Sequence, residues 1–100
     1  MATSTFEVVA TYTAIQGREQ EVLAGLQDLA QASRLEEGNL SYEYFQGVED
    51  PLRIIILESY RTAEDFQAHR DSEHFQRIGV GTIIPLLENR AVSTYESIDD

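Results

Sequence analysis

The sequence predicts an α+β fold in which two helices cover one face of a four-stranded antiparallel sheet. Three observations predict it. Four segments have the alternation or the β-branched content of strands, and two segments repeat their apolar residues at helical spacing. These segments follow one another in the order β-α-β-β-α-β. That order is the split βαβ, or ferredoxin-like, plan.

Length and composition indicate a single domain. One hundred residues with 42% hydrophobic content suffice for one two-layer core but not for two. No internal repeat, linker or low-complexity segment divides the chain. We therefore expect one domain over 1–100, with its core over about 6–98.

Charge and cysteine content exclude several classes of function. Seven basic and 18 acidic residues give a net charge of −11, which repels nucleic-acid phosphates and anionic lipids, so we expect neither nucleic-acid nor membrane binding. The sequence has no run long enough for a membrane span and no signal-peptide pattern, and a cytoplasmic protein is expected. The absence of cysteine excludes disulfides, thiolate nucleophiles, iron–sulfur clusters and cysteine-based zinc sites.

The first strand is expected over 6–14, and a helix follows from Arg18. The strand places Phe6, Val8, Ala10 and Tyr12 on one face. The helix is indicated by apolar residues at i, i+3, i+4 and i+7 spacing, namely Val22, Leu23, Leu26, Leu29 and Ala30. Gly38-Asn39 is interpreted as its C-cap.

Two further strands are expected as a hairpin. Residues 40–48 place Leu40, Tyr42 and Tyr44 on one face, and the turn 49–51 leads into a strand over 52–60. The latter strand is apolar on both faces, so both faces require cover.

A second helix is expected to begin at Ala63. Thr62 and Asp65 resemble a capping box, and the inward positions would be Phe66 and His69 or Arg70. Ser72 is a candidate cap for a further helical segment, in which apolar residues recur at helical spacing: Phe75, Ile78, Ile83 and Leu86, together with Thr82.

Two glycines and a proline argue against regular helix in that further segment, and a closing strand follows it. Gly79, Gly81 and Pro85 weaken or kink a helix interior. The closing strand is expected over about 91–98.

One face of the predicted sheet has no helix to cover it. Because the strand over 52–60 is apolar on both sides, we expect this face to pack against the same face of a second copy. The sequence therefore predicts a homodimer.

Residues 36–76 resemble the antibiotic biosynthesis monooxygenase domain, a group of dimeric α+β barrels. The resemblance rests on a set of short motifs and extends over roughly 6–98. The motifs are Glu37-Gly38-Asn39, Tyr42 with Tyr44, Glu58 with Tyr60, Ala68-His69, and Ser72 with His74-Phe75.

This resemblance implies one of several activities. The family includes cofactor-independent quinol and polyketide oxygenases, haem-degrading enzymes, an autoinducer-2-processing branch, and members without known activity. Haem degradation is not expected, because Ala10, His69 and Gly79 stand where that branch has Asn, Trp and His. Tyr60 replaces a Trp of some oxygenases, and the Glu-x-Tyr form is more similar to the autoinducer-2-processing branch.

His69, Glu58 and Tyr60 are the candidate catalytic residues. A neutral imidazole at His69 could move a proton near neutral pH, or it could be a hydrogen-bonded core histidine. Glu58 shares a face with apolar residues, so it is either an acid, a base or an orienter of His69, or a structural hydrogen-bonding group.

The candidate substrate-binding residues are Tyr12, Tyr44, Phe66 and His74. Tyrosines that carry a hydroxyl at the end of an apolar ring suit a ring-shaped polar substrate, although such residues are also common in cores and interfaces. His74 lies five positions after His69, about 500° round an α-helix, and is therefore expected on a different face. For the same reason no metal site is expected at these histidines.

The functional expectation is a cofactor-independent monooxygenase that acts on a small quinol, polyphenol or polyketide-like compound. Proton removal by His69 or a neighbouring carboxylate would give an anion that reacts with O₂ or isomerises. The alternatives are an isomerase or degradation enzyme for a small oxygenated signal, such as phosphorylated autoinducer-2, and a non-catalytic dimeric barrel that binds a small ligand.

Overall fold

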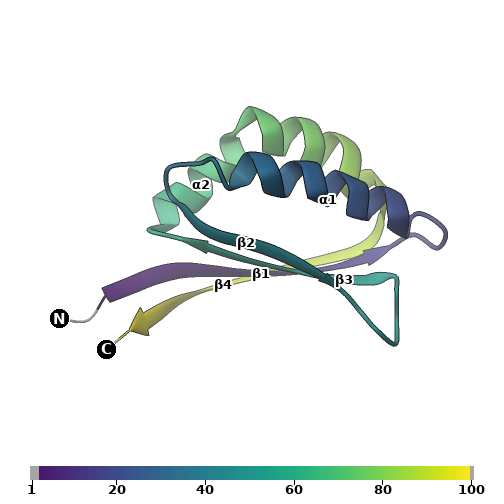
Figure 1. Cartoon of the computed structure of the whole chain (residues 1–100), viewed down its shortest axis with the longest axis horizontal. Helices are drawn as coiled ribbons and strands as arrows, with labels where there is room; N and C mark the ends of the chain where they lie inside the picture. Colours follow the sequence, from purple (N-terminus) through teal and green to yellow (C-terminus); the bar gives the residue numbers. More distant parts are fainter. Residues whose placement is uncertain (1–2, 100) are drawn as a thin grey trace.

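The computed structural model describes residues 3–99 and confirms the predicted α+β fold (Figure 1). A four-stranded antiparallel sheet forms one layer, and the helices form the other. The elements in chain order are β1 (Thr3–Ala14), α1 (Glu19–Ser33), β2 (Asn39–Gln46), β3 (Arg53–Tyr60), α2 (Ala63–Asp71), the π-helix η1 (Phe75–Ile83), the 3₁₀ turn η2 (Ile84–Leu86) and β4 (Leu87–Asp99).

The sheet has the strand order β2-β3-β1-β4, with every neighbouring pair antiparallel. Strands β1 and β4 pair over almost their whole length, from Thr3 opposite Asp99 to Ala14 opposite Leu87. The closing strand therefore begins at Leu87 rather than near residue 91, because its first residues continue the ladder with β1.

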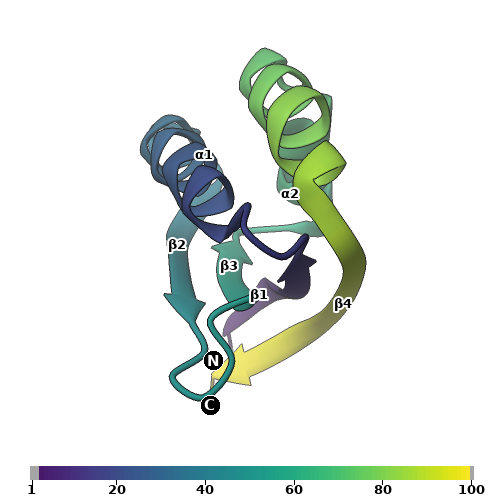
Figure 2. The same cartoon turned by 90° about the vertical axis from the view of Figure 1, so that its right-hand side faces the viewer.

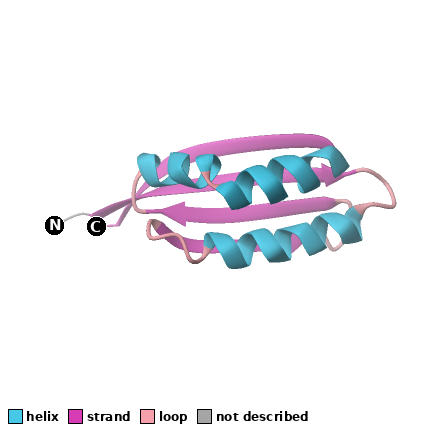
Figure 3. Cartoon of the chain, turned by 90° about the horizontal axis from the view of Figure 1, so that it is seen from above, coloured by secondary structure: helices cyan, strands magenta, loops and turns pink. Residues whose placement is uncertain are grey.

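The two helical segments lie side by side on the same face of the sheet, as Figure 2 and Figure 3 show. One segment is α1, and the other consists of α2 and η1 in succession. Strand residues that alternate along β1 and β3 point toward these helices and are buried: Val8, Ala10, Tyr12, Ala14, Ile54, Ile56, Glu58 and Tyr60. The predicted alternation of β1 is confirmed.

Helix α1 ends at Ser33, with Arg34 as its C-cap, so the prediction of a cap at Gly38-Asn39 was wrong. The Arg34 guanidinium donates to the Tyr42 carbonyl oxygen from Nε at 3.1 Å and Nη2 at 2.7 Å, which holds the turn after the helix against β2. The absence of a side chain at Gly38 instead allows the turn after α1 to lie against Asp65. A Cβ at this position would lie 2.2 Å from Cγ of Asp65, at the beginning of α2.

Helix α2 begins as its capping residues predict. The Thr62 hydroxyl accepts from the Asp65 backbone N–H at 3.1 Å, and Phe66 and His69 are the buried residues of the helix. Arg70, the alternative inward residue, is exposed. The helix ends before Ser72, whose extended backbone (φ −67°, ψ 153°) separates α2 from η1.

Segment η1 is a π-helix, in which backbone N–H groups bond to carbonyls five residues earlier. The wider turn places Ile78 and Ile83 in the core but leaves Thr82, which shares their helical spacing in the sequence, exposed. Pro85 lies in the 3₁₀ turn that leads into β4.

The hairpin strands are shorter than predicted, at 39–46 and 53–60. The register between β2 and β3 shifts around Leu40, whose side chain is half exposed instead of sharing the buried face of Tyr42. No helix within the described residues 3–99 is long and apolar enough to cross a membrane.

Candidate active site

A cavity of about 390 Å³ lies between the sheet and the segment formed by α2, η1 and η2. Strands β1 and β4 form its floor, and the end of β3 closes one side. Its lining mixes apolar and titratable side chains: Val8, Ala10, Tyr12, Glu58, Phe66, Gln67, His69, Arg70, Asp71, Phe75, Gln76, Val80, Ile84, Arg90 and Val92. Such a mixture suits a small organic ligand with a few polar groups.

His69 is buried in the wall of this cavity, with 2% of its surface exposed. Its Nδ1 lies 2.8 Å from Oε2 of Glu36, and its Nε2 lies 3.6 Å from Oε1 of Glu58. Phe66 and Phe75 pack against the ring, with centroids at 6.1 Å and 5.1 Å. Carboxylates therefore face both nitrogens of an imidazole whose plane is held by aromatic neighbours.

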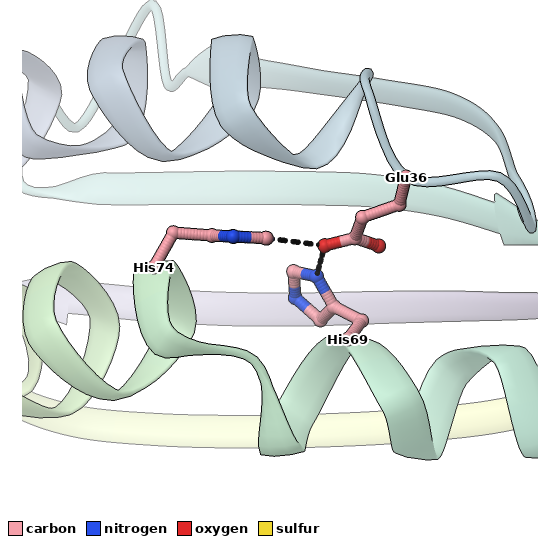
Figure 4. Close-up of side chains that lie close together, drawn as sticks. All are labelled: Glu36, His69 and His74. Atoms are coloured by element: carbon pink, nitrogen blue, oxygen red, sulfur yellow. Dashed lines mark hydrogen bonds and ion pairs between the residues drawn. The ribbon is translucent and has the colours of Figure 1, made fainter.

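Glu36 joins the two histidines of the chain (Figure 4). It lies in the turn between α1 and β2, and its Oε2 is 2.8 Å from His69 Nδ1 and 2.5 Å from His74 Nε2. Because a carboxylate accepts and does not donate, the hydrogen bond to Glu36 requires a proton on His69 Nδ1, and in the neutral imidazole Nε2 is then the nitrogen with the lone pair. Glu36 Oε1 is buried without a partner among residues 3–99.

The two histidines converge on Glu36, so the prediction that they lie on different faces was wrong. A spacing of five residues separates them only on a continuous α-helix, whereas the chain is extended at Ser72 and a new helical segment follows. The Ser72 hydroxyl donates to the His69 carbonyl at 2.6 Å and accepts from the Phe75 N–H at 3.2 Å. His74 contacts Glu36 and does not line the cavity.

Within the described residues 3–99, Glu36, His69 and His74 form the one group of side chains that could hold a metal ion. One ligand atom from each lies within 4.8 Å of the others, which removes the spacing argument against a metal site. The two oxygen-to-nitrogen distances are nevertheless those of hydrogen bonds. Two ligands of a tetrahedral zinc ion are about 3.3 Å apart, given bonds of about 2.0 Å. The arrangement is that of a carboxylate bridging two imidazoles.

Glu58 lies on the cavity wall and is buried, on the same sheet face as the apolar Val8 and Ile56. Burial raises the pKa of its carboxyl group, an effect that the Tyr60 hydrogen bond and the nearby His69 partly oppose. The Tyr60 hydroxyl donates to Glu58 Oε1 at 2.7 Å. Tyr60 is fully buried, does not line the cavity, and contacts Glu58.

The predicted substrate-binding residues separate into two groups. Tyr12 and Phe66 line the cavity. Burial raises the pKa of Tyr12, and the neighbouring Arg90 guanidinium partly offsets this. Tyr44 packs against the hydrophobic core and does not line the cavity.

Three residues of the site were not selected from the sequence. Glu36 lies in a turn that no apolar periodicity marks, and Arg70 and Arg90 carry ordinary surface residue types. A signal was available for Arg90, because extending the closing strand to Leu87 places it beside Tyr12. Glu36 offered none, since its partners lie more than 30 positions away.

Comparisons with known proteins agree with this architecture. A protein of Bacillus subtilis (strain 168) named "Putative monooxygenase YcnE" is 34% identical over 59 residues, which cover 59% of this chain and 62% of that protein. The chain thus matches less than two thirds of this curated relative's length.

Solved structures share the fold over nearly the whole chain. Protein SO0527 from Shewanella oneidensis superposes with a TM-score of 0.89 at 22% identity, covering 98% of this chain and 95% of that one. PA3566 from Pseudomonas aeruginosa superposes with a TM-score of 0.86 at 27% identity, covering 95% of both chains.

The family model "Antibiotic biosynthesis monooxygenase" (ABM) matches residues 5–79. This range includes β1 from Thr5 onward, both strands of the hairpin, and the residues around His69 that carry the resemblance seen in the sequence. The chain therefore belongs to the antibiotic biosynthesis monooxygenase family.

Proposed function

We propose that this chain is a monooxygenase that acts, without an organic cofactor or a metal, on a small quinol, polyphenol or polyketide-like compound in the cavity. The observation that carries the proposal is the position of His69, buried at the cavity wall between two carboxylates. Membership of the ABM family and the name of the Bacillus subtilis relative support the reaction class.

His69 is the proposed general base. Its Nδ1–H donates to Glu36, so the free lone pair on Nε2 can accept a proton from a substrate O–H or C–H group. Glu36 then stabilises the imidazolium that forms, because its carboxylate lies 2.8 Å from Nδ1. In this role Glu36 positions the base and touches no substrate.

Glu58 is the proposed proton carrier beside the base. Its burial favours the protonated form, and its Oε1 lies 3.6 Å from His69 Nε2. Tyr60 orients this oxygen through its hydrogen bond. Glu58 can therefore return a proton to an intermediate or product after His69 has removed one.

The oxygenation step balances without an outside reductant. Deprotonation of a phenol gives an electron-rich anion that can transfer electrons to O₂. In a polyketide-like phenol whose activated carbon is a CH₂ group in the keto form, this carbon becomes a carbonyl. In a quinol, a ring C–H becomes C–OH while the quinol is oxidised to the quinone. In both cases one oxygen atom of O₂ enters the product and the other leaves as water. The substrate supplies all four electrons.

Isomerisation is the second candidate, because proton removal and return by His69 and Glu58 need no oxygen. Oxygen uptake separates the two reactions. Turnover of a panel of quinols and polyphenols is measured in air and under argon, with an oxygen electrode and product analysis.

If the protein is an oxygenase, the amount of O₂ consumed should be proportional to the amount of product formed. The proposal also predicts a loss of about 10²-fold to 10⁴-fold in kcat for His69→Gln at an unchanged melting temperature. Equal turnover with and without air would overturn the oxygenase and favour the isomerase. Full activity of a folded His69→Gln variant would overturn both.

A further inference from the structure

The cationic residues of this chain are few, and most are already engaged. The sequence contains seven arginines and no lysine, at a net charge of −11. Within residues 3–99, three arginines form ion pairs with carboxylates, and a fourth donates to a backbone carbonyl. These are Arg18 with Glu21, Arg61 with Asp65, Arg77 with Glu73, and Arg34 with the carbonyl of Tyr42.

The remaining arginines are Arg53, Arg70 and Arg90, and none has an ion pair within residues 3–99. Arg70 and Arg90 both line the cavity that holds His69, whereas Arg53 lies outside it. Of the three arginines without an ion pair within residues 3–99, two therefore lie at one cavity of a strongly acidic chain.

Each guanidinium group has an aromatic residue beside it. The Arg70 group lies over the Phe66 ring, with Cζ 5.4 Å from the centroid. Arg90 is directly opposite Tyr12 in the β1–β4 ladder, and its charge acts on the Tyr12 hydroxyl. These contacts orient the groups without neutralising them, so most of their N–H donors are available to a ligand.

The two carboxyl groups at the cavity differ in exposure. Asp71 is exposed and accepts from Gln67 Nε2 at 3.0 Å, whereas Glu58 is buried and accepts from the Tyr60 hydroxyl. Two guanidinium groups thus oppose one exposed carboxylate, on a molecule whose remaining surface repels anions. Planar guanidinium groups in such a setting match carboxylate and phosphate oxygens.

We propose that Arg70 and Arg90 bind an anionic group of the substrate, a carboxylate or a phosphate, and so present its reactive O–H or C–H group to His69. The anion site itself follows from the arginines, and only the orientation toward His69 rests on the proposed function. The substrate class is a small phenolic or oxygenated compound with one anionic substituent.

The test compares neutral and anionic probes of similar size. The probes are hydroquinone, 2,5-dihydroxybenzoate, 4-hydroxyphenyl phosphate and inorganic phosphate. Binding is measured by calorimetry and by NMR shifts of cavity residues for the wild type, Arg70→Gln and Arg90→Gln. Arg53→Gln is the matched control, because it makes the same charge change outside the cavity.

The wild type should bind at least one anionic phenol about tenfold or more tightly than hydroquinone. Each cavity substitution should weaken that binding about tenfold to 100-fold, and Arg53→Gln should change it less than about twofold. Preference for the benzoate or for the phosphate ester identifies the anion. Binding of inorganic phosphate alone would assign the site to the phosphate group.

Three results would overturn the inference. The first is equal affinity for hydroquinone and for both anionic phenols. The second is a loss of affinity in Arg53→Gln as large as that in the cavity variants, and the third is no anion binding up to about 10 mM. Oxidation of hydroquinone without any anion preference would leave the proposed monooxygenase intact. Anion binding without turnover in any quinol assay would leave the anion site and remove the proposed function.

Discussion

His69 is the residue on which the proposed chemistry depends, because a carboxylate faces each of its ring nitrogens. Glu36 accepts from Nδ1 and so determines which ring nitrogen carries the proton. Glu58 lies beside Nε2, the atom that removes a proton from the substrate in the proposed reaction. The two carboxylates differ in setting, since Glu58 lines the cavity and Glu36 does not.

Replacing Glu36 by Gln should lower kcat about tenfold to 100-fold with little change in KM, because Glu36 orients the base without lining the cavity. The imidazole ¹⁵N shifts of His69 should report the Nδ1–H tautomer in the wild type and a changed tautomer balance in the variant. Glu37→Gln is the control, since the neighbouring Glu37 is 91% exposed and pairs with Arg61 at 3.8 Å. Identical ¹⁵N shifts in Glu36→Gln and the wild type would contradict the role.

The raised pKa of Glu58 predicts how stability varies with pH. In the folded chain Glu58 retains its proton to a higher pH than in the unfolded chain, because burial disfavours the carboxylate. Its contribution to the unfolding free energy is therefore fully present below the ordinary glutamate pKa and is lost as pH rises through the raised value. Glu58→Gln, which cannot ionise, removes this loss.

Urea unfolding of the wild type and of Glu58→Gln between about pH 4 and pH 8 measures the effect. The unfolding free energy of the wild type should fall more steeply with pH in that window than that of the variant. A steeper fall in the variant would show that Glu58 is stabilised as a carboxylate.

At the scale of elements, the break between α2 and η1 brings the two histidines to one carboxylate. Ser72 adopts an extended backbone there, and its hydroxyl bonds to the end of α2 and the beginning of η1 at once. A continuous helix would turn His74 away from Glu36, as the spacing of five residues predicts.

Ser72→Ala should therefore destabilise the chain by about 0.5–2 kcal/mol, the usual effect of removing a helix cap. Thermal or urea unfolding measures this, and the NMR signals of both histidine rings should shift. Ser93→Ala is a suitable control, because Ser93 is exposed on β4. An effect no larger than that of the control would show that the break does not depend on the Ser72 hydroxyl.

At the scale of the whole molecule, the sheet face opposite the helices carries exposed apolar side chains. Leu57 and Phe45 are 39% and 50% exposed, and Val9 and Ile55 are half-buried neighbours across the strand ladders. An apolar face of this kind on a small domain is typical of an interface between subunits. We propose that two copies of the chain pack through it.

Sedimentation should then give twice the 11.3 kDa mass of one chain for the wild type. Leu57→Glu should give a monomer, because each copy would bring a charge into the apolar contact. The same substitution at Leu35, which is 87% exposed in the turn after α1, should leave the dimer unchanged. A wild type that sediments as a stable monomer would rule out this assembly.

Local patterns were sufficient to predict the fold. The order of elements, the inward face of β1, the Thr62 cap and the inward positions Phe66 and His69 follow from alternation, helical spacing and capping, which depend on neighbours in the chain. The early end of α1 and the π-helix at η1 escaped prediction, because contacts with distant segments decide them.

The sequence by itself determined the two-layer plan. It also determined that Glu58 and Tyr60 lie at the end of β3 and that His69 lies on α2. Only the tertiary structure placed Glu36 at His69 and brought His74 to the same oxygen, and only it placed Arg90 beside Tyr12 at the cavity. The reason is physical. Periodicity records which side of an element faces the core, whereas the pairing of polar groups depends on how distant elements approach one another.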